Sequence, residues 1–244
     1  PDRSNQERRT KNQEPRMRLS TRKLLDRSFT SVGIFAIILM ALALVIILTP
    51  IFVRGAQAFV FRATVEYRLL MFEKFERGER DEIEAELAAS EKDRQPIYDM
   101  IGTFRDELKS FSFAERRQYR DALADLEERL HELLGPAPGQ PKPVMFRDQY
   151  GQTRWDRAQV KFEDVMFVEQ WDYSNPDAMG VKVLVPRVND FKGTSLEPMF
   201  AYLEEHFADI MRPKLTFYWR FLFDKSKDSH FFGGIWPELL GTIY

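Results

Sequence analysis

The hydrophobic pattern is dominated by an uncharged run from Ser28 to Val53, which is 26 residues long. About 20 helical residues cross the ~30 Å hydrocarbon layer of a bilayer, so this run is long enough to span it with room for tilt. A buried helix of a soluble protein is the alternative, but such helices rarely stay apolar over this length. The pattern predicts a transmembrane helix over residues 28–53, with Pro50 in its last turn.

The charges on either side of this run predict its orientation. Residues 1–27, before the run, carry nine Lys or Arg and four Asp or Glu. In the twenty residues after the run, only Arg54, Arg62 and Arg68 are basic. Because the more basic flank stays in the cytoplasm, we expect a basic cytoplasmic tail over 1–27 in a bacterial inner membrane, and an extracytoplasmic chain beyond about residue 54. A cleaved signal peptide is the alternative, but its apolar core would span only about 7–15 residues.

The stretch 54–134 has a helical pattern. Charges of alternating sign around Val65, Leu69 and Phe72 predict a helix that continues out of the membrane from about Val60 and breaks at Gly78. A second helix is expected over 80–95, ending before Pro96, because proline disfavours a helical conformation at the preceding residue. A third helix should follow, with apolar residues at Ile97, Ile101, Phe104 and Leu108.

The next helix has a clear start and a clear end. Ser112 and Glu115 form a capping-box pattern, and Gly135-Pro136 is a typical stop signal. Between them, apolar residues recur at spacings of four and three, at Tyr119, Leu123, Leu126, Leu130 and Leu133. This stripe predicts an antiparallel helical hairpin, with a dimeric coiled coil as the alternative.

The composition changes after this helix. Residues 135–143, GPAPGQPKP, predict a stiff linker, and residues 144–229 a region of mixed helix and strand. Strands are expected over 165–168 and 181–185, separated by a turn at 175–177, and a last helix over about 196–211, capped by Ser195 or Thr194. The expected fold class is therefore mainly α with a small α+β portion.

Aromatic residues gather towards the end of the chain, over 215–223 and 231–244. Phe, Tyr and Trp are enriched where a chain meets lipid headgroups, so the pattern predicts a return to the membrane around Gly233, Gly234, Trp236 and Pro237. An aromatic segment of a soluble core is the alternative. We expect residues 230–244 to begin a larger transmembrane core, and the chain to be a piece of a longer protein.

The residue types needed for catalysis do not assemble into a motif. The chain has no cysteine, no P-loop and no zinc-protease motif, and its three histidines are scattered. Glu204-Glu205-His206 and the carboxylates Glu163, Asp164 and Glu169 fit solvated surfaces better than a metal or glycosidase site. We therefore expect no catalytic, metal-binding or cofactor-binding residue in this chain. The net charge of about −7 outside the basic tail argues against nucleic-acid binding.

A cluster of basic and aromatic residues is the candidate docking surface for a partner. It comprises Arg147, Tyr150, Arg154 and Trp155. Arginine forks and an aromatic face are suited to an anionic partner. The alternative is a turn at Gly151 with Trp155 packed into the core.

Two segments carry a resemblance to a known family. The last fourteen residues, FFGGIWPELLGTIY, and the run RKLLDRSFTSVGIFAIILMALAL resemble the phosphate-specific (Pst) ABC transporter permease family, A subunit. The stretches GAQAFVFRATVEYRLLMFEKFERG, LLGPAPG, YGQTRWDRA and LTFYWRFLFDKSKDSHFFGG are similar to a long external insertion found in some members. The insertion, about 175 residues in this chain, departs from the usual short loop.

This resemblance implies a non-enzymatic subunit of an ATP-driven phosphate importer. Its implied partners are a second permease subunit, ATPase subunits that hydrolyse ATP, an extracytoplasmic phosphate-binding protein and the lipid bilayer. The phosphate path and the coupling helix of the family would lie beyond Tyr244. The alternative from another class is a single-pass anchored sensor or envelope scaffold, which would explain the span and the helices but not the final apolar segment.

Overall fold

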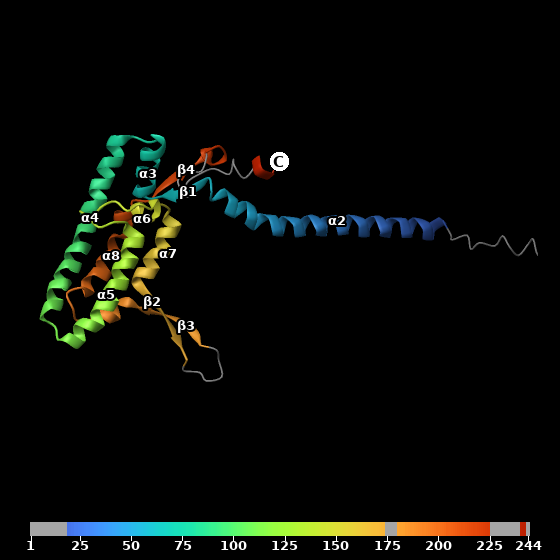
Figure 1. Ribbon diagram of the computed structural model, residues 1–244. Helices are drawn as coiled ribbons and strands as arrows, with labels where there is room; N and C mark the ends of the chain where they lie inside the picture. Colours follow the sequence, from blue (N-terminus) through green and yellow to red (C-terminus); the bar gives the residue numbers. More distant parts are fainter. Residues whose placement is uncertain (1–18, 174–179, 225–239, 243–244) are drawn as a thin grey trace, which may run out of the picture. The chain divides into compact units, whose positions relative to one another are not determined.

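The computed structural model describes residues 19–173, 180–224 and 240–242, without the side chains of 19–26 and Arg147. The chain divides into two compact units, residues 1–56 and residues 57–244. Over the described residues the protein is mainly helical, with two small antiparallel sheets (Figure 1). The predicted fold class is confirmed.

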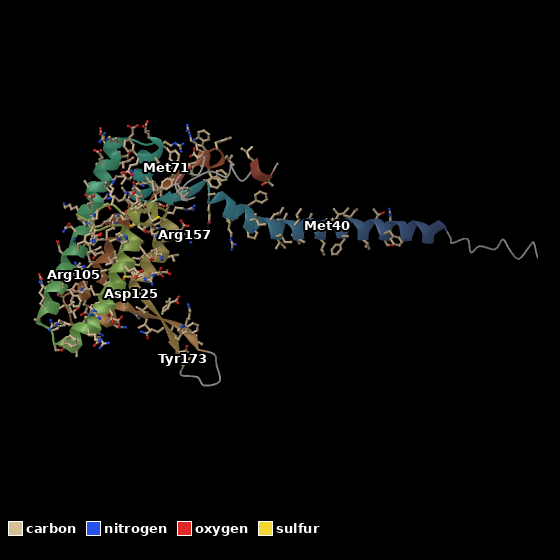
Figure 2. All side chains as sticks on the ribbon, in the orientation of Figure 1. Met40, Met71, Arg105, Asp125, Arg157 and Tyr173 are labelled. Atoms are coloured by element: carbon tan, nitrogen blue, oxygen red, sulfur yellow. The ribbon has the colours of Figure 1, made fainter. Side chains whose placement is uncertain are left out.

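The first unit contains one long helix, α2 (Leu19–Ala56). Its segment Arg27–Ala56 is long and apolar enough to cross a membrane. Apolar side chains such as Met40, 68% exposed, project on all sides of it (Figure 2). An exposed helix that is apolar all round is compatible with an apolar surrounding such as hydrocarbon.

The second unit begins with a strand. β1 (Val60–Ala63) is followed by α3 (Val65–Phe75), α4 (Arg80–Glu107), a short 3₁₀ turn η1 (Leu108–Ser110) and α5 (Phe113–Leu134). The prediction that a helix runs on from Val60 is wrong for these first four residues. They pair with a strand more than 150 residues later, which a local pattern does not reveal.

The remainder of the unit alternates short helices and strands. α6 (Phe146–Tyr150) and α7 (Trp155–Met166) precede the hairpin of β2 (Phe167–Asp172) and β3 (Val181–Pro186). The 3₁₀ helix η2 (Arg187–Phe191), α8 (Glu197–Met211), β4 (Lys214–Phe217) and the 3₁₀ helix η3 (Trp219–Leu222) follow. The turn predicted at 175–177 lies outside the described residues, and Gly180 precedes β3.

One hydrophobic core joins the predicted helical region to the predicted mixed region. α4, α5, α7 and α8 all contribute to it, and α4, α5 and α8 lie side by side in Figure 1. Its fully buried residues include Phe104, Leu126, Leu133, Phe191, Met199, Leu203 and Ile210. The elements from α4 to α8 therefore share this core, although the GPAPGQPKP segment interrupts the helices, and Phe61, Ala63, Tyr67 and Met71 form a second, smaller cluster.

Several local predictions are confirmed in detail. The capping box of α5 is present, with the Ser112 amide donating to Glu115 Oε2 at 2.9 Å. The leucines of the predicted stripe are buried, and Tyr119 packs at the edge of the core. α5 ends at Leu134, where Gly135 adopts a positive φ of 79°. α5 returns alongside α4 after the turn η1, as expected of a hairpin.

Three boundaries differ from those predicted. α4 continues through Pro96, because Ile97 and Phe104 are fully buried, and this burial outweighs the lost hydrogen bond and the proline clash. Val165 and Met166 end α7, and the strand begins at Phe167. The N-cap of α8 is Leu196 and not one of the predicted hydroxyl residues. The Ser195 hydroxyl donates to Glu107, and the Thr194 hydroxyl donates to the Phe191 carbonyl at 2.7 Å, so neither caps the helix.

Candidate functional site

The predicted docking residues lie in different settings. Tyr150 is only 5% exposed, and the half-buried Trp155 stacks on Phe207 with ring centroids 4.7 Å apart. Tyr150 is therefore too buried to offer a docking face, and docking by the other residues stays a prediction. The side chain of Arg147, in α6, lies outside what the structure describes. The alternative interpretation, a turn at Gly151 with Trp155 packed on the core, fits the geometry.

Arg154 holds the start of the domain together. Its guanidinium donates to the Gln57 carbonyl at 3.0 Å and to Asp156 at 3.2 Å, and it lies 4.4 Å from the centroid of the Phe61 ring. A β-bridge also joins Arg154 to Ala63. These contacts, together with the β-bridge, hold β1 beside Arg154.

A second group of contacts ties α3 to α4. The Arg94 guanidinium makes a buried ion pair with Glu66, and it donates to the Leu134 carbonyl at 3.1 Å. Both side chains are less than a tenth exposed. A buried charge is tolerated when it is paired and hydrogen-bonded, so the pair fixes the register of α3 on α4.

A third group of charges surrounds Glu86 on α4. Arg68 and Lys214 both form ion pairs with this carboxylate, and Arg68 also donates to the carbonyls of Ala63 and Arg212. Burial by itself would raise the pKa of Glu86, but the hydrogen bonds from Lys214 and Arg68 outweigh it and hold the pKa below its usual range. The network connects α3 and α4 to the end of α8 and the start of β4.

The strand at the start of the domain is joined to the strand that follows α8. β1 and β4 pair antiparallel, with Val60 opposite Phe217 and Ala63 opposite Lys214. The Tyr218 amide donates to the Phe59 carbonyl at 2.6 Å, which extends this connection beyond the strands. The start of the domain and the segment that follows α8 therefore lie side by side.

An ion pair closes the same end. Both terminal nitrogens of Arg77 donate to Asp224, at 2.7 and 2.9 Å, and the Tyr218 hydroxyl donates to Asp224 at 2.6 Å. The hydrogen bonds from Arg77 hold the pKa of Asp224 below its usual range. Burial, together with donation to Asp224, raises the pKa of Tyr218. We refer to Arg77, Tyr218 and Asp224 as the terminal clasp.

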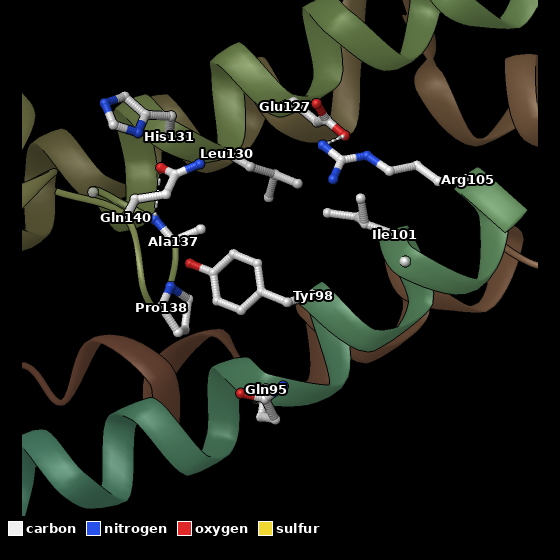
Figure 3. Close-up of a pocket in the computed structure, with 12 residues that line it drawn as sticks. Gln95, Tyr98, Ile101, Arg105, Glu127, Leu130, His131, Ala137, Pro138 and Gln140 are labelled. Atoms are coloured by element: carbon white, nitrogen blue, oxygen red, sulfur yellow. Dashed lines mark hydrogen bonds and ion pairs between the residues drawn. The ribbon is translucent and has the colours of Figure 1, made fainter.

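A cavity of about 350 Å³ lies between α4 and α5 (Figure 3). Tyr98 projects into it towards the loop of Ala137 and Pro138, and Arg105 pairs with Glu127 at its rim at 2.7 Å. Burial raises the pKa of Tyr98, so this phenol stays neutral. The cavity lies between exposed helix faces, and its polar groups do not converge on one point.

The hairpin of β2 and β3 extends away from the helices (Figure 1). Among its exposed apolar residues are Trp171 at 55%, Val181 at 59% and Leu184 at 59%, and Tyr173 near its tip is 71% exposed (Figure 2). A two-stranded ribbon with apolar side chains in water is marginally stable by itself, so this arm is suited to being covered by another surface.

The carboxylates and histidine considered above form ordinary surface contacts. His206 packs against Tyr202 and lies 3.8 Å from Asp209, while Asp164 pairs with Lys161 and Glu169 with Lys182. Within residues 19–173, 180–224 and 240–242, no three metal-ligating side chains lie together. The contacts described for these groups are structural.

The fold and the surfaces together define a helical domain that follows one apolar helix long enough to cross a membrane. Comparison with family models, curated protein sequences and solved structures gave no match. The functional conclusion therefore depends on the residues and contacts described above.

Proposed function

We propose that this chain is part of a permease subunit of an ATP-driven phosphate importer of the bacterial inner membrane. In this proposal residues 1–27 are cytoplasmic, α2 spans the bilayer, and residues after about 54 form an extracytoplasmic domain inserted between two membrane spans. The basic tail and the weakly basic segment after the span support this orientation.

The observation that carries the proposal is the pairing of β1 with β4. A domain inserted between two neighbouring spans has to return the chain close to the point where it left the membrane. The strand pairing, the hydrogen bond from Tyr218 to Phe59 and the terminal clasp provide this arrangement. The apolar segment 231–244, which resembles the permease family, follows shortly after the clasp.

The β2–β3 hairpin supports a docking role for the inserted domain. Val183 and Leu184 are exposed on opposite faces of the ribbon, at 41% and 59%. An ordered, projecting ribbon of this kind is suited to contact the extracytoplasmic phosphate-binding protein or the second permease subunit. The transport reaction itself would be driven by partner ATPase subunits.

The test is phosphate uptake in cells that lack the gene. We expect the deletion to abolish high-affinity uptake of radiolabelled phosphate at micromolar concentration, and a plasmid copy to restore it. Affinity purification of the complemented protein should recover a second permease subunit and ATPase subunits. Unchanged uptake together with the absence of an ATPase partner would instead indicate an anchored sensor or scaffold.

A hairpin variant tests the docking role separately. Leu184→Lys should reduce uptake at unchanged protein level in the membrane, because a charge replaces an apolar contact. Phe113→Lys is the matched control, since Phe113 is 79% exposed at the start of α5 and away from the hairpin. Equal uptake in both variants would contradict the docking role of the hairpin, but it would not contradict the transport proposal.

A further inference from the structure

The outward face of the β1–β4 sheet is apolar with one basic side chain. Opposite residues in an antiparallel pair share a face, so Val60 and Phe217 lie on the same side as Arg62 and Leu215. All four are exposed, with Leu215 at 77% and Phe217 at 67%. On the other face Phe61 and Ala63 are buried against Tyr67 and Met71. We call the four exposed residues the outer face.

The exposed aromatic character continues into η3. Trp219 and Phe223 are 53% and 57% exposed, and the Arg220 guanidinium lies 5.1 Å from the centroid of the Trp219 ring. Tryptophan beside arginine is a typical pair of the headgroup layer, where the ring contacts acyl chains and the cation remains near phosphate. Exposed apolar side chains of this size are costly in water.

A shallow hollow lies beside the same strand. It has a volume of about 200 Å³ and is lined by residues of β1 together with Gln57, Arg154, Trp155 and Asp156. Arg154 is engaged by Asp156 and by the Gln57 carbonyl, so its charge is largely matched. Arg62 is exposed, and no ion pair is found for it within the described part of the chain. This arginine is therefore a cation available to an outside ligand.

The length of the chain keeps this surface near a bilayer. Only Gln57, Ala58 and Phe59 separate the last residue of the candidate span, Ala56, from the first residue of β1. Three residues reach about 10 Å, which is comparable to the thickness of one headgroup layer. The outer face thus stays within reach of lipid headgroups, which offer apolar chains and phosphate together.

We propose that the outer face and η3 lie on the extracytoplasmic surface of the bilayer, where Arg62 binds the phosphate of an anionic phospholipid headgroup. Val60, Leu215 and Phe217 enter the boundary between headgroups and acyl chains. This contact would hold the base of the domain against the membrane. The proposal depends on membrane insertion of α2 and not on phosphate transport.

Because the chain has no cysteine, single labels report on this surface directly. Leu215→Cys and Phe217→Cys would each carry a nitroxide on the full chain, reconstituted in vesicles of phosphatidylcholine with phosphatidylglycerol. Relaxation by molecular oxygen, which concentrates in lipid, is compared with relaxation by a water-soluble nickel complex. Phe113→Cys is the control, because Phe113 is also exposed but lies at the start of α5.

We expect the labels at positions 215 and 217 to be accessible to oxygen and protected from nickel, and the label at position 113 to be accessible to nickel. Three results would overturn the proposal. The labels at 215 and 217 could be as accessible to nickel as the control, which would show that the outer face is exposed to water. They could be shielded from both reagents, which would show that another protein covers the outer face. They could also show dipolar broadening, which would show that a second copy of this chain lies against it.

Arg62→Gln tests headgroup recognition. One basic side chain near an anionic membrane surface contributes about 1 kcal/mol, so the ratio of docked to undocked label should fall about fivefold on vesicles with phosphatidylglycerol. On pure phosphatidylcholine the variant should change the ratio much less. Arg117→Gln, at an exposed arginine of α5, is the matched control. An equal effect of both substitutions would overturn the role given to Arg62.

Discussion

At the scale of single residues, the most consequential contact is the buried pair of Arg94 and Glu66. Neither residue lies in a motif, and their partnership joins two helices separated by a turn. Removing one member leaves the other charge buried without a partner, whereas the exposed pair of Arg80 and Glu84 remains solvated when broken. The two Arg–Glu pairs therefore differ in how much their loss destabilises the fold, because only one of them is buried.

We predict that Arg94→Met lowers the free energy of unfolding by about 3–5 kcal/mol, because Glu66 would stay buried and unpaired. Arg80→Met should change it by less than about 0.5 kcal/mol. Thermal unfolding of the full chain in detergent, followed by circular dichroism, measures both. The double variant Glu66→Leu with Arg94→Met should recover part of the loss. Similar effects of the two single variants would contradict this account.

At the scale of elements, close approach of backbone segments decides which residues are allowed. Gly151 has a φ of 57°, and a Cβ there would lie 2.6 Å from the Leu133 carbonyl oxygen and 2.7 Å from the Gly135 nitrogen. The segment after α6 therefore crosses the end of α5 where only glycine fits. Gly139 also has a positive φ, of 82°, but a Cβ there meets nothing within 4 Å.

This contrast gives a matched pair of variants. Gly139→Ala should cost about 1–2 kcal/mol, from the left-handed backbone alone. Gly151→Ala should cost roughly 1–3 kcal/mol more, because the clash with two backbone segments adds an overpacking penalty. The midpoints of chemical denaturation of the two variants measure the difference. Equal midpoints would show that α6 moves away from α5 freely.

Helix α4 shows how packing overrides a local signal. Pro96 predicts a helix boundary, and an interior proline costs about 3 kcal/mol relative to alanine. Ile97 and Phe104 are both fully buried in the core, and their burial contributes more than that cost. The helix therefore continues because of contacts with elements that follow much later in the chain.

At the scale of the whole molecule, the terminal clasp ties the turn after α3 to the segment after β4. The stability that the ion pair between Arg77 and Asp224 contributes depends on pH. The pKa of Asp224 lies below that of a free aspartate, about 3.9, because Arg77 donates to its carboxylate. The stabilisation is therefore present above about pH 4 and is lost as the pH falls through the lowered pKa of the folded state.

We predict that Asp224→Asn lowers the melting temperature near pH 6, by an amount corresponding to about 2 kcal/mol. The difference from the unchanged chain should shrink as the pH falls below 4. Asp106→Asn serves as control, since Asp106 also has a lowered pKa from its hydrogen bond with Lys109 but is exposed. A difference for Asp224→Asn that stays constant with pH would contradict the clasp.

The sequence by itself determined the features that depend on neighbouring residues. The candidate span, the capping box of α5, its buried leucines and its end at Gly135 all follow from short-range spacing and composition. The sequence Val-Phe-Arg-Ala of Val60–Ala63 does not alternate between apolar and polar residues, and only the folded structure shows the exposed and buried positions of β1. Its four residues are too few to separate a strand from the end of a helix.

The tertiary structure decided the features that depend on distant partners. β1 is a strand because β4 lies beside it, Tyr150 and Trp155 pack inside the domain, and Ser195 contacts Glu107 in place of capping α8. The outer face likewise exists only after β1 and β4 have paired. The physical reason is that burial and hydrogen bonding stabilise contacts between residues far apart in the sequence. Periodicity and capping signals depend only on residues within a few helical turns of each other.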